Sequence, residues 1–82
     1  MALGTLLRFE RGRRFWRHVR VGAHDECWPW EGEVDADGHG VYAGGRADAH
    51  AYELVMGRAP AGALAHRCGD PRCVNPDHLE PR

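Results

Sequence analysis

Four residues with thiol or imidazole side chains give this sequence its clearest chemical signal. Cys68, Cys73 and His78 are separated from one another by four residues each, in a loop that contains glycine and proline. Thiolate and imidazole groups brought together in this way suit tetrahedral zinc, and Cys27, the only other cysteine, is the natural fourth ligand. A site with four protein ligands has no open position, so the sequence predicts a structural Zn²⁺ rather than a catalytic one.

The small number of large apolar side chains gives this metal a role in folding. Leucine, isoleucine, valine and phenylalanine supply only 14 of the 82 residues. Apolar burial at about 25 cal/mol per Å² does not offset an ordering cost of about 1.5 kcal/mol per residue in such a chain. We therefore expect the free energy of zinc binding to stabilise the fold.

The state of the cysteines depends on the compartment. Residues 1–7 have no basic leader and are too short for a signal peptide, and no apolar run approaches the ~20 residues of a membrane helix. We therefore expect a cytoplasmic protein with no membrane partner, in which cysteines stay reduced. A disulfide between Cys68 and Cys73 is the alternative.

Charge is unevenly distributed along the chain. The formal net charge is −1, which gives no overall attraction to nucleic acid, and all 11 cationic residues are arginines. Arginine suits bidentate phosphate contacts, but a bias in genome composition explains the absence of lysine equally well. Six arginines crowd one short stretch: Arg8, Arg11, Arg13, Arg14, Arg17 and Arg20.

Short elements are predicted along the whole chain. Residues 1–13 are expected to form an N-terminal arm and residues 14–82 one domain. Asp48 is a suitable N-cap and Gly57 a suitable C′ residue for a helix between them. In order, we expect a helical turn over 15–19, an extended segment over 27–30 whose tryptophans cover the core, a hairpin over 35–45, a helix over 49–56, a strand over 63–66, a helical turn after Asn75-Pro76, and a second strand over 79–82.

The motifs resemble those of the HNH (ββα-metal, His-Me finger) endonucleases, in the zinc-stapled branch that includes the His-Cys box homing endonucleases and small phage HNH proteins. Besides the cysteine loop, four upstream stretches look like that family's motifs in the right order: Arg14-Phe15-Trp16 with Val19, Cys27-Trp28-Pro29-Trp30-Glu31-Gly32, Asp37-Gly38-His39-Gly40 and Ala49-His50-Ala51-Tyr52-Glu53-Leu54. The resemblance therefore runs from about residue 14 to 81. It implies an α+β fold, a small zinc-stabilised ββα-metal domain with short hairpins and short helices.

The resemblance also implies a reaction. His66, just before the zinc loop, would be the general base in hydrolysis of a DNA phosphodiester, with Mg²⁺ or Mn²⁺ as a separate catalytic ion. Alternatives for His66 are a zinc ligand in place of Cys27 or an ordinary strand histidine. Asn75 is expected to brace the loop and His50 to be structural. The candidate phosphate contacts are Arg46, Arg58, Arg67 and Arg72.

The sequence departs from the family's pattern in three places. The helix that completes the motif and holds the catalytic ion would fall beyond Arg82, so the domain is expected to be truncated at its C-terminal end. Ala51 stands where the family has an arginine, and Ala65 leaves His66 without a neighbouring carboxylate. Asp70, Asp77 or a second copy of the chain in a homodimer are possible substitutes. The alternative function is a catalytically degenerate module that binds DNA or a phage packaging or replication protein.

Overall fold

The described chain forms two helices, two antiparallel hairpins and one 3₁₀ turn. The computed structural model describes residues 12–81, so the predicted arm lies largely outside the described residues. The small α+β fold predicted from the sequence is confirmed. The elements are α2 (Arg13–Trp16), β1 (Val41–Tyr42), β2 (Gly45–Arg46), α3 (Ala47–Met56), β3 (Leu64–His66), the 3₁₀ helix η1 (Pro76–His78) and β4 (Leu79–Pro81).

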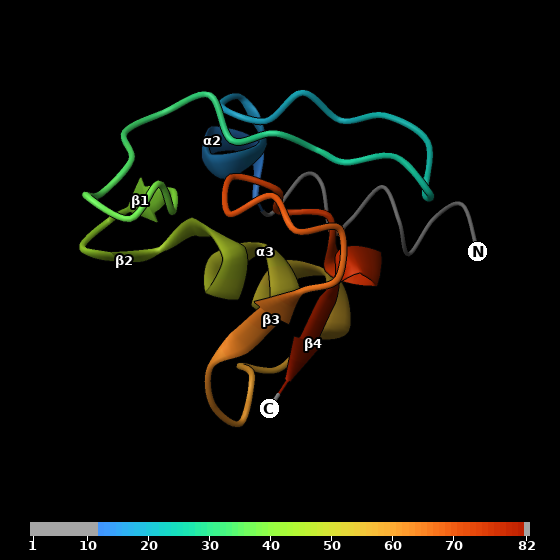
Figure 1. The fold of residues 1–82 in the computed structure, drawn as a ribbon. Coiled ribbons are helices and arrows are strands. Elements are labelled where there is room, and N and C mark those ends of the chain that lie inside the picture. Colours follow the sequence, from blue (N-terminus) through green and yellow to red (C-terminus); the bar gives the residue numbers. More distant parts are fainter. Residues whose placement is uncertain (1–11, 82) are drawn as a thin grey trace.

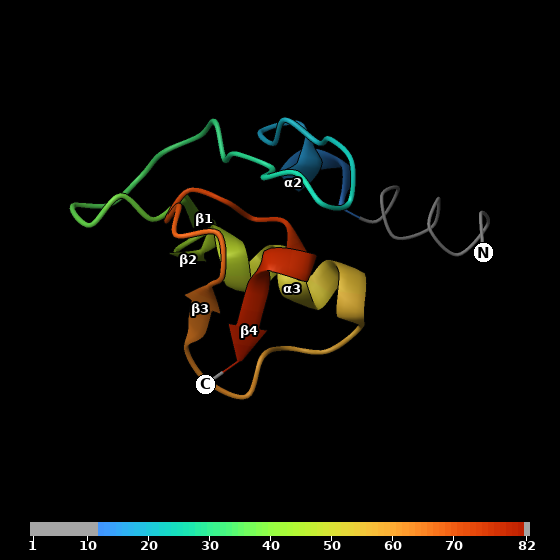
Figure 2. The same ribbon diagram turned by 45° about the vertical axis from the view of Figure 1, so that its right-hand side comes forward.

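Helix α3 lies at the centre of the arrangement. Both views place α2 and the long segment that follows it on one side of α3, and the β3–β4 hairpin on the other (Figures 1 and 2). The β1–β2 hairpin leads directly into α3, and η1 packs against the same helix. Each half of the molecule therefore buries its apolar side chains against α3.

The larger of the two hydrophobic clusters is aromatic. Phe15 and Trp30 are each 1% exposed, and their ring centroids lie 5.0 Å apart. Trp16 and Trp28 complete the aromatic layer, so the prediction that the tryptophans cover the core is confirmed. Gly40 is required beside them, because a Cβ there would lie 2.5 Å from the Trp30 side chain.

The smaller cluster joins α3 to the β3–β4 hairpin. Tyr52 from α3, Leu64 from β3 and Leu79 from β4 pack together and are each at most 8% exposed. With three large side chains, this cluster alone provides little apolar burial. The hairpin therefore needs further interactions with the rest of the fold to be stable.

Helix α3 starts earlier than the sequence predicts. It begins at Ala47 with Arg46 as its N-cap, so the prediction of a helix over 49–56 capped by Asp48 is wrong at this end. The Asp48 carboxylate lies within the first turn and has other partners. At the other end, Gly57 adopts a left-handed conformation with φ 82° and ends the helix as predicted.

The two hairpins have different connections. In β1–β2, Ala43 and Gly44 both have positive φ, 53° and 81°, which is the geometry of a two-residue type I′ turn. In β3–β4, His66 pairs with Leu79, and the cysteine loop and η1 connect the two strands. The hairpin therefore closes across the predicted metal loop. Among residues 12–81, no helix has the length and apolar character needed to cross a membrane.

Candidate metal centre and the adjoining histidine

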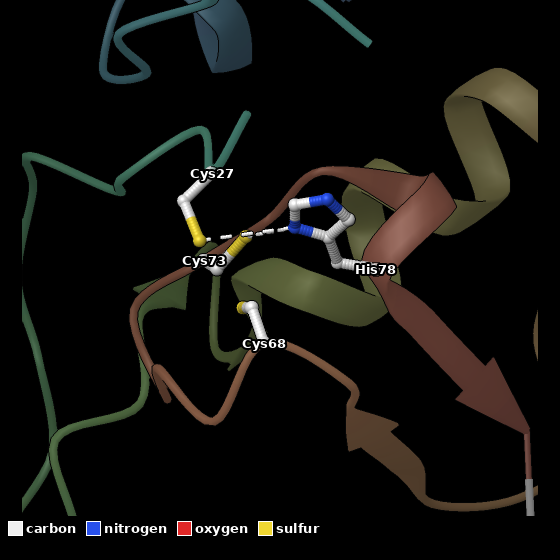
Figure 3. Close-up of side chains that lie close together, drawn as sticks. All are labelled: Cys27, Cys68, Cys73 and His78. Atoms are coloured by element: carbon white, nitrogen blue, oxygen red, sulfur yellow. Dashed lines mark hydrogen bonds between the residues drawn. The ribbon is translucent and has the colours of Figure 1, made fainter. Parts of the chain in front are cut away.

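The four predicted metal ligands converge in space. Cys27, Cys68, Cys73 and His78 present ligand atoms that all lie within 4.8 Å of one another. Figure 3 shows the three thiols and the imidazole pointing toward a common centre. They come from the segment before Trp28, from the loop after β3 and from η1, so segments far apart in sequence form one group, here termed the cysteine–histidine cluster.

The distances in the cluster fit tetrahedral coordination. His78 Nδ1 lies 3.7 Å from Cys27 Sγ and 3.6 Å from Cys73 Sγ. Zn–S and Zn–N bonds of about 2.3 and 2.1 Å, meeting near the tetrahedral angle, would separate sulfur from nitrogen by about 3.6 Å. The cluster could therefore hold a metal ion such as zinc.

Backbone pairing brings Cys27 to the cysteine loop. Val74 N–H donates to Trp28 O and Trp30 N–H donates to Arg72 O, each at 2.9 Å. These bonds place the extended segment after Cys27 antiparallel to the loop around Cys73. The proline in the Trp28–Trp30 segment favours the extended conformation that this pairing needs.

Asn75 fixes the same two segments through its side chain. It is 1% exposed, and its Nδ2 donates to His24 O at 2.8 Å and to Glu26 O at 2.6 Å. Its Oδ1 accepts from Asp77 N–H at 2.9 Å and so caps η1, which carries His78. One buried amide therefore connects the chain before Cys27 to the turn that presents the imidazole.

Proximity of the thiols changes their protonation. The hydrogen bond with Cys68, then burial and the Cys73 thiol, raises the pKa of Cys27 to about 12. Burial raises the pKa of Cys73, whereas hydrogen bonds from the Asp70 backbone and the two neighbouring thiols outweigh burial and lower the pKa of Cys68. A metal ion entering this group would therefore displace protons.

The alternatives to this ligand set find no support in the geometry. All three cysteines are free thiols, so no disulfide joins Cys68 to Cys73. His66 does not belong to the cluster, although it is only two residues from Cys68. Its imidazole instead contacts the first turn of α3.

His66 and Asp48 form a buried pair beside the metal loop. His66 Nε2 lies 2.8 Å from Asp48 Oδ2, and the two side chains are 7% and 5% exposed. Arg46 Nη2 lies 2.7 Å from the same carboxylate oxygen. The Nδ1 atom of His66 is buried and has no hydrogen-bond partner within the described chain.

Asp48 is the site residue that the sequence reasoning missed. Ala65 supplies no carboxylate beside His66 in the sequence, but Asp48, 18 positions away, meets His66 when α3 packs beside β3. An aspartate at the start of a helix is typical of a cap. That local pattern carried no signal of a contact with a strand outside the helix.

The four arginines predicted to contact phosphate have different surroundings. Arg46 is bound to Asp48, and Arg72 donates through Nε and Nη2 to Trp30 O at 3.2 and 2.8 Å. Arg58 and Arg67 are exposed, and Arg67 lines a polar hollow beside the metal ligands Cys68 and His78. Arg72 is exposed as well, but its guanidinium is already used in hydrogen bonds to Trp30 O.

His50 packs within the aromatic layer. Its ring stacks on Phe15 at a centroid distance of 5.3 Å and meets Tyr42 edge-on at 4.9 Å. These contacts lie on the face of α3 toward α2, away from the partners of His66. His50 therefore has a packing role in this arrangement.

A second group of ligand-type side chains occupies the turn before β1. Asp35, Asp37 and His39, here termed the acidic turn, also place ligand atoms within 4.8 Å of one another. Asp35 Oδ1 already accepts from the backbone N–H groups of Asp37 and His39, at 2.9 and 3.0 Å. Those backbone bonds explain why the three side chains lie close together. The His39 ring also lies near His66, with a centroid distance of 5.7 Å.

The comparisons with known proteins agree with this arrangement. Residues 46–81, which include α3, the metal loop and both strands of the β3–β4 hairpin, match the family model of the HNH endonucleases. The chain is also similar to Protein 2.8 of Escherichia phage T7, with 36% identity over 55 residues that make up 65% of this chain and 40% of the relative. No solved structure matches the chain.

Residues 46–81 match the HNH endonuclease family, so the resemblance predicted from the sequence is confirmed over this part of the chain. The cysteine–histidine cluster is consistent with the zinc-stapled branch. The chain spans about two fifths of the length of the phage T7 relative that it matches.

Proposed function

We propose that this chain hydrolyses DNA phosphodiester bonds with His66 as general base, and that Zn²⁺ in the cysteine–histidine cluster holds that residue in place. The observation that carries the proposal is the position of His66. It is the last residue of β3, two residues before a metal ligand, inside the segment that matches the HNH endonucleases.

Zinc is the proposed ion because of the donor set. Three sulfurs and one imidazole nitrogen form the soft, tetrahedral environment that favours zinc among the common biological cations. All four positions are filled by the protein, so this ion would have no open position for water. Its role would be to hold the β3–β4 connection closed and so to fix the position of His66.

His66 would accept the proton of the attacking water at Nδ1. Its Nε2 is occupied by Asp48, which leaves Nδ1 as the nitrogen without a partner. An imidazole near neutral pH can take up a proton in this way, provided that the water lies within hydrogen-bond reach. Because Nδ1 is covered by protein atoms, a neighbouring group must move before water can contact it, and the exposed acidic turn carries the adjacent His39 ring.

A divalent ion such as Mg²⁺ or Mn²⁺ would supply charge stabilisation at the phosphate. The carboxylate that contacts His66 is not free to hold this ion. The nearest carboxylate, Asp48, is already bonded to Arg46, to His66 and to Ala49 N–H. We therefore assign no ligand to this ion.

Phosphate contacts are proposed for the exposed arginines. Arg58 follows α3 and Arg67 follows His66 directly, and neither guanidinium is used in the ion pairs found within residues 12–81. Arg46 is more than a third exposed and has donors beyond the one on Asp48. These side chains could hold a phosphodiester close to β3.

A plasmid-nicking assay with zinc-loaded protein tests the proposal. Mg²⁺ or Mn²⁺ should support nicking, and His66→Ala should abolish it while the zinc content stays at the wild-type value. His18→Ala is the matched control, since His18 is exposed and belongs to neither the cluster nor the His66 pair. Undiminished nicking by His66→Ala would remove the proposed base.

The buried position of Nδ1 favours a second candidate function. If no group moves to admit water, the domain would be a non-catalytic module that binds DNA or a protein of a phage packaging or replication machine. Its DNA affinity would fall steeply with salt, because arginine–phosphate contacts release counterions. Binding of this kind without nicking under any divalent ion would select the second candidate.

A further inference from the structure

The contact between Asp48 and His66 suggests a role beyond joining two elements. Both side chains are more than nine-tenths buried, and Nε2 lies 2.8 Å from Oδ2. A buried hydrogen bond to a charged group is stronger than an exposed one and is directional. The orientation of the imidazole ring is therefore set by the carboxylate.

Both carboxylate oxygens of Asp48 accept hydrogen bonds from groups that can only donate. Oδ2 accepts from Arg46 Nη2 at 2.7 Å, and Oδ1 accepts from Ala49 N–H at 2.6 Å. Asp48 also lies in the first turn of α3, where the unpaired N–H groups of the helix favour a negative charge. Arg46 and the helix thus compensate a carboxylate that burial alone would disfavour.

The carboxylate fixes the location of the histidine proton. Its two oxygens already act as acceptors for Arg46 and Ala49 N–H, so Nε2 of His66 is the donor in its contact with Oδ2. In the neutral ring the single proton is then on Nε2, and Nδ1 carries the free lone pair. Nδ1 is also the nitrogen with no partner in the described chain, so it is the one that a substrate water would reach once a neighbouring group moves aside.

We propose that Asp48 is a positioning residue that holds His66 in the Nε2–H tautomer and presents Nδ1 as the basic atom. The inference rests on the proposed function of His66. When Nδ1 takes the proton from water, the ring becomes positive while it faces the Asp48 carboxylate, which lowers the energy of that state. Arg46, in this arrangement, orients Asp48 instead of serving only as a phosphate contact.

The tautomer can be measured in the protein without DNA. We would record ¹⁵N NMR spectra of zinc-loaded protein labelled at histidine, in wild type and in Asp48→Ala, at one pH at which the ring is neutral. The wild type should show His66 protonated on Nε2, and Asp48→Ala should lose this preference and show both tautomers. An Nδ1–H tautomer in the wild type, or an unchanged Nε2–H tautomer in Asp48→Ala, would overturn the proposal.

The kinetic test separates positioning from a purely structural contact. In Asp48→Ala, kcat for plasmid nicking should fall at least tenfold with little change in KM, since DNA contacts remain. Glu53→Ala removes one exposed charge from the same helix and is the matched control. If the Asp48–His66 contact were purely structural, Asp48→Ala would lower the melting temperature but leave kcat and the His66 tautomer of the folded protein unchanged.

Asp48→Asn provides a second variant if the alanine variant does not fold. Its amide oxygen can accept from both Arg46 and His66, so the Nε2–H tautomer should persist, while the lost negative charge should still reduce kcat. Full wild-type kcat in Asp48→Asn would contradict the role of the charge. If the wild type does not nick DNA at all, the proposed function fails, and the NMR result still decides whether Asp48 sets the tautomer.

Discussion

The cysteine–histidine cluster and the acidic turn both contain ligand atoms within 4.8 Å of one another, but they differ in how this proximity arises. Cys27 and His78 are 51 residues apart and meet only because the chain folds. Asp35, Asp37 and His39 lie within five residues, and a single turn brings them together. Proximity between distant, partly buried groups indicates a site that the fold maintains, whereas proximity within one exposed turn is explained by the turn itself.

The two groups also differ in what already satisfies their side chains. Asp35 Oδ1 accepts two backbone N–H groups of its own turn. The thiols have mainly one another as partners, and Cys73 is fully buried with Val74 and Asn75 at its side. A metal ion therefore adds much to the cysteine–histidine cluster and little to the acidic turn. Four experiments can break or sharpen this contrast.

The largest effect is expected from Cys73→Ser. Structural zinc in small domains contributes about 10–16 kcal/mol of binding free energy, and loss of a buried sulfur ligand would remove most of the advantage of the folded state. We expect no cooperative thermal transition by circular dichroism and less than one zinc per chain. Asp37→Ser, in the acidic turn, should keep both, and a cooperatively folded Cys73→Ser protein would refute the contrast.

A smaller loss is expected from Asn75→Ala. The substitution leaves the carbonyls of His24 and Glu26 without their donor and uncaps η1, so it should cost about 2–4 kcal/mol in urea unfolding of the zinc-loaded protein. Asn75→Asp keeps the cap acceptor but places a carboxylate against both carbonyls. It should cost at least as much, and wild-type stability in Asn75→Asp would show that the donated bonds contribute little.

Metal binding by the cysteine–histidine cluster should depend on pH. Cys27, with its pKa raised to about 12, holds its proton at neutral pH and must release it to a metal, so zinc affinity should fall as pH falls. Each displaced proton changes the affinity by about tenfold per pH unit. Competition with a chromophoric chelator at two pH values measures this slope, and a pH-independent affinity would mean that the thiols are not the ligands.

The smallest effect is expected from Asp35→Asn. The hydrogen bond from the backbone N–H of His39 is the main reason that the pKa of Asp35 is lowered. Burial opposes this shift, and the N–H of Asp37 adds to it. A lowered folded-state pKa means that its contribution to stability is fully present above the ordinary aspartate pKa and is lost only as pH falls through the lowered value. The small difference in melting temperature between wild type and Asp35→Asn should therefore stay constant from neutral pH to about pH 5, and a difference that shrinks in that interval would contradict this assignment.

Much of the fold and the metal site could be predicted because their signals are local or chemically rare. Strands β3 and β4 and the end of α3 at Gly57 follow from short patterns of apolar residues and glycine, whereas Ala43, predicted as part of a strand, lies in the β1–β2 turn. The four metal ligands follow from the presence of only three cysteines and from their spacing to His78. Asn75 before a proline predicts the cap of η1 for the same reason.

The sequence by itself determined which cysteine and histidine side chains could share one metal ion. It also determined which short segments turn or extend, because those choices depend on neighbouring residues. Only the tertiary structure decided that Asp48 faces His66, that Arg46 binds the same carboxylate oxygen and that His39 lies beside them. Those contacts arise from the docking of α3 against β3 and the acidic turn. Docking depends on the summed packing of Tyr52, Leu64 and Leu79 and of the aromatic layer, which no single spacing in the chain records.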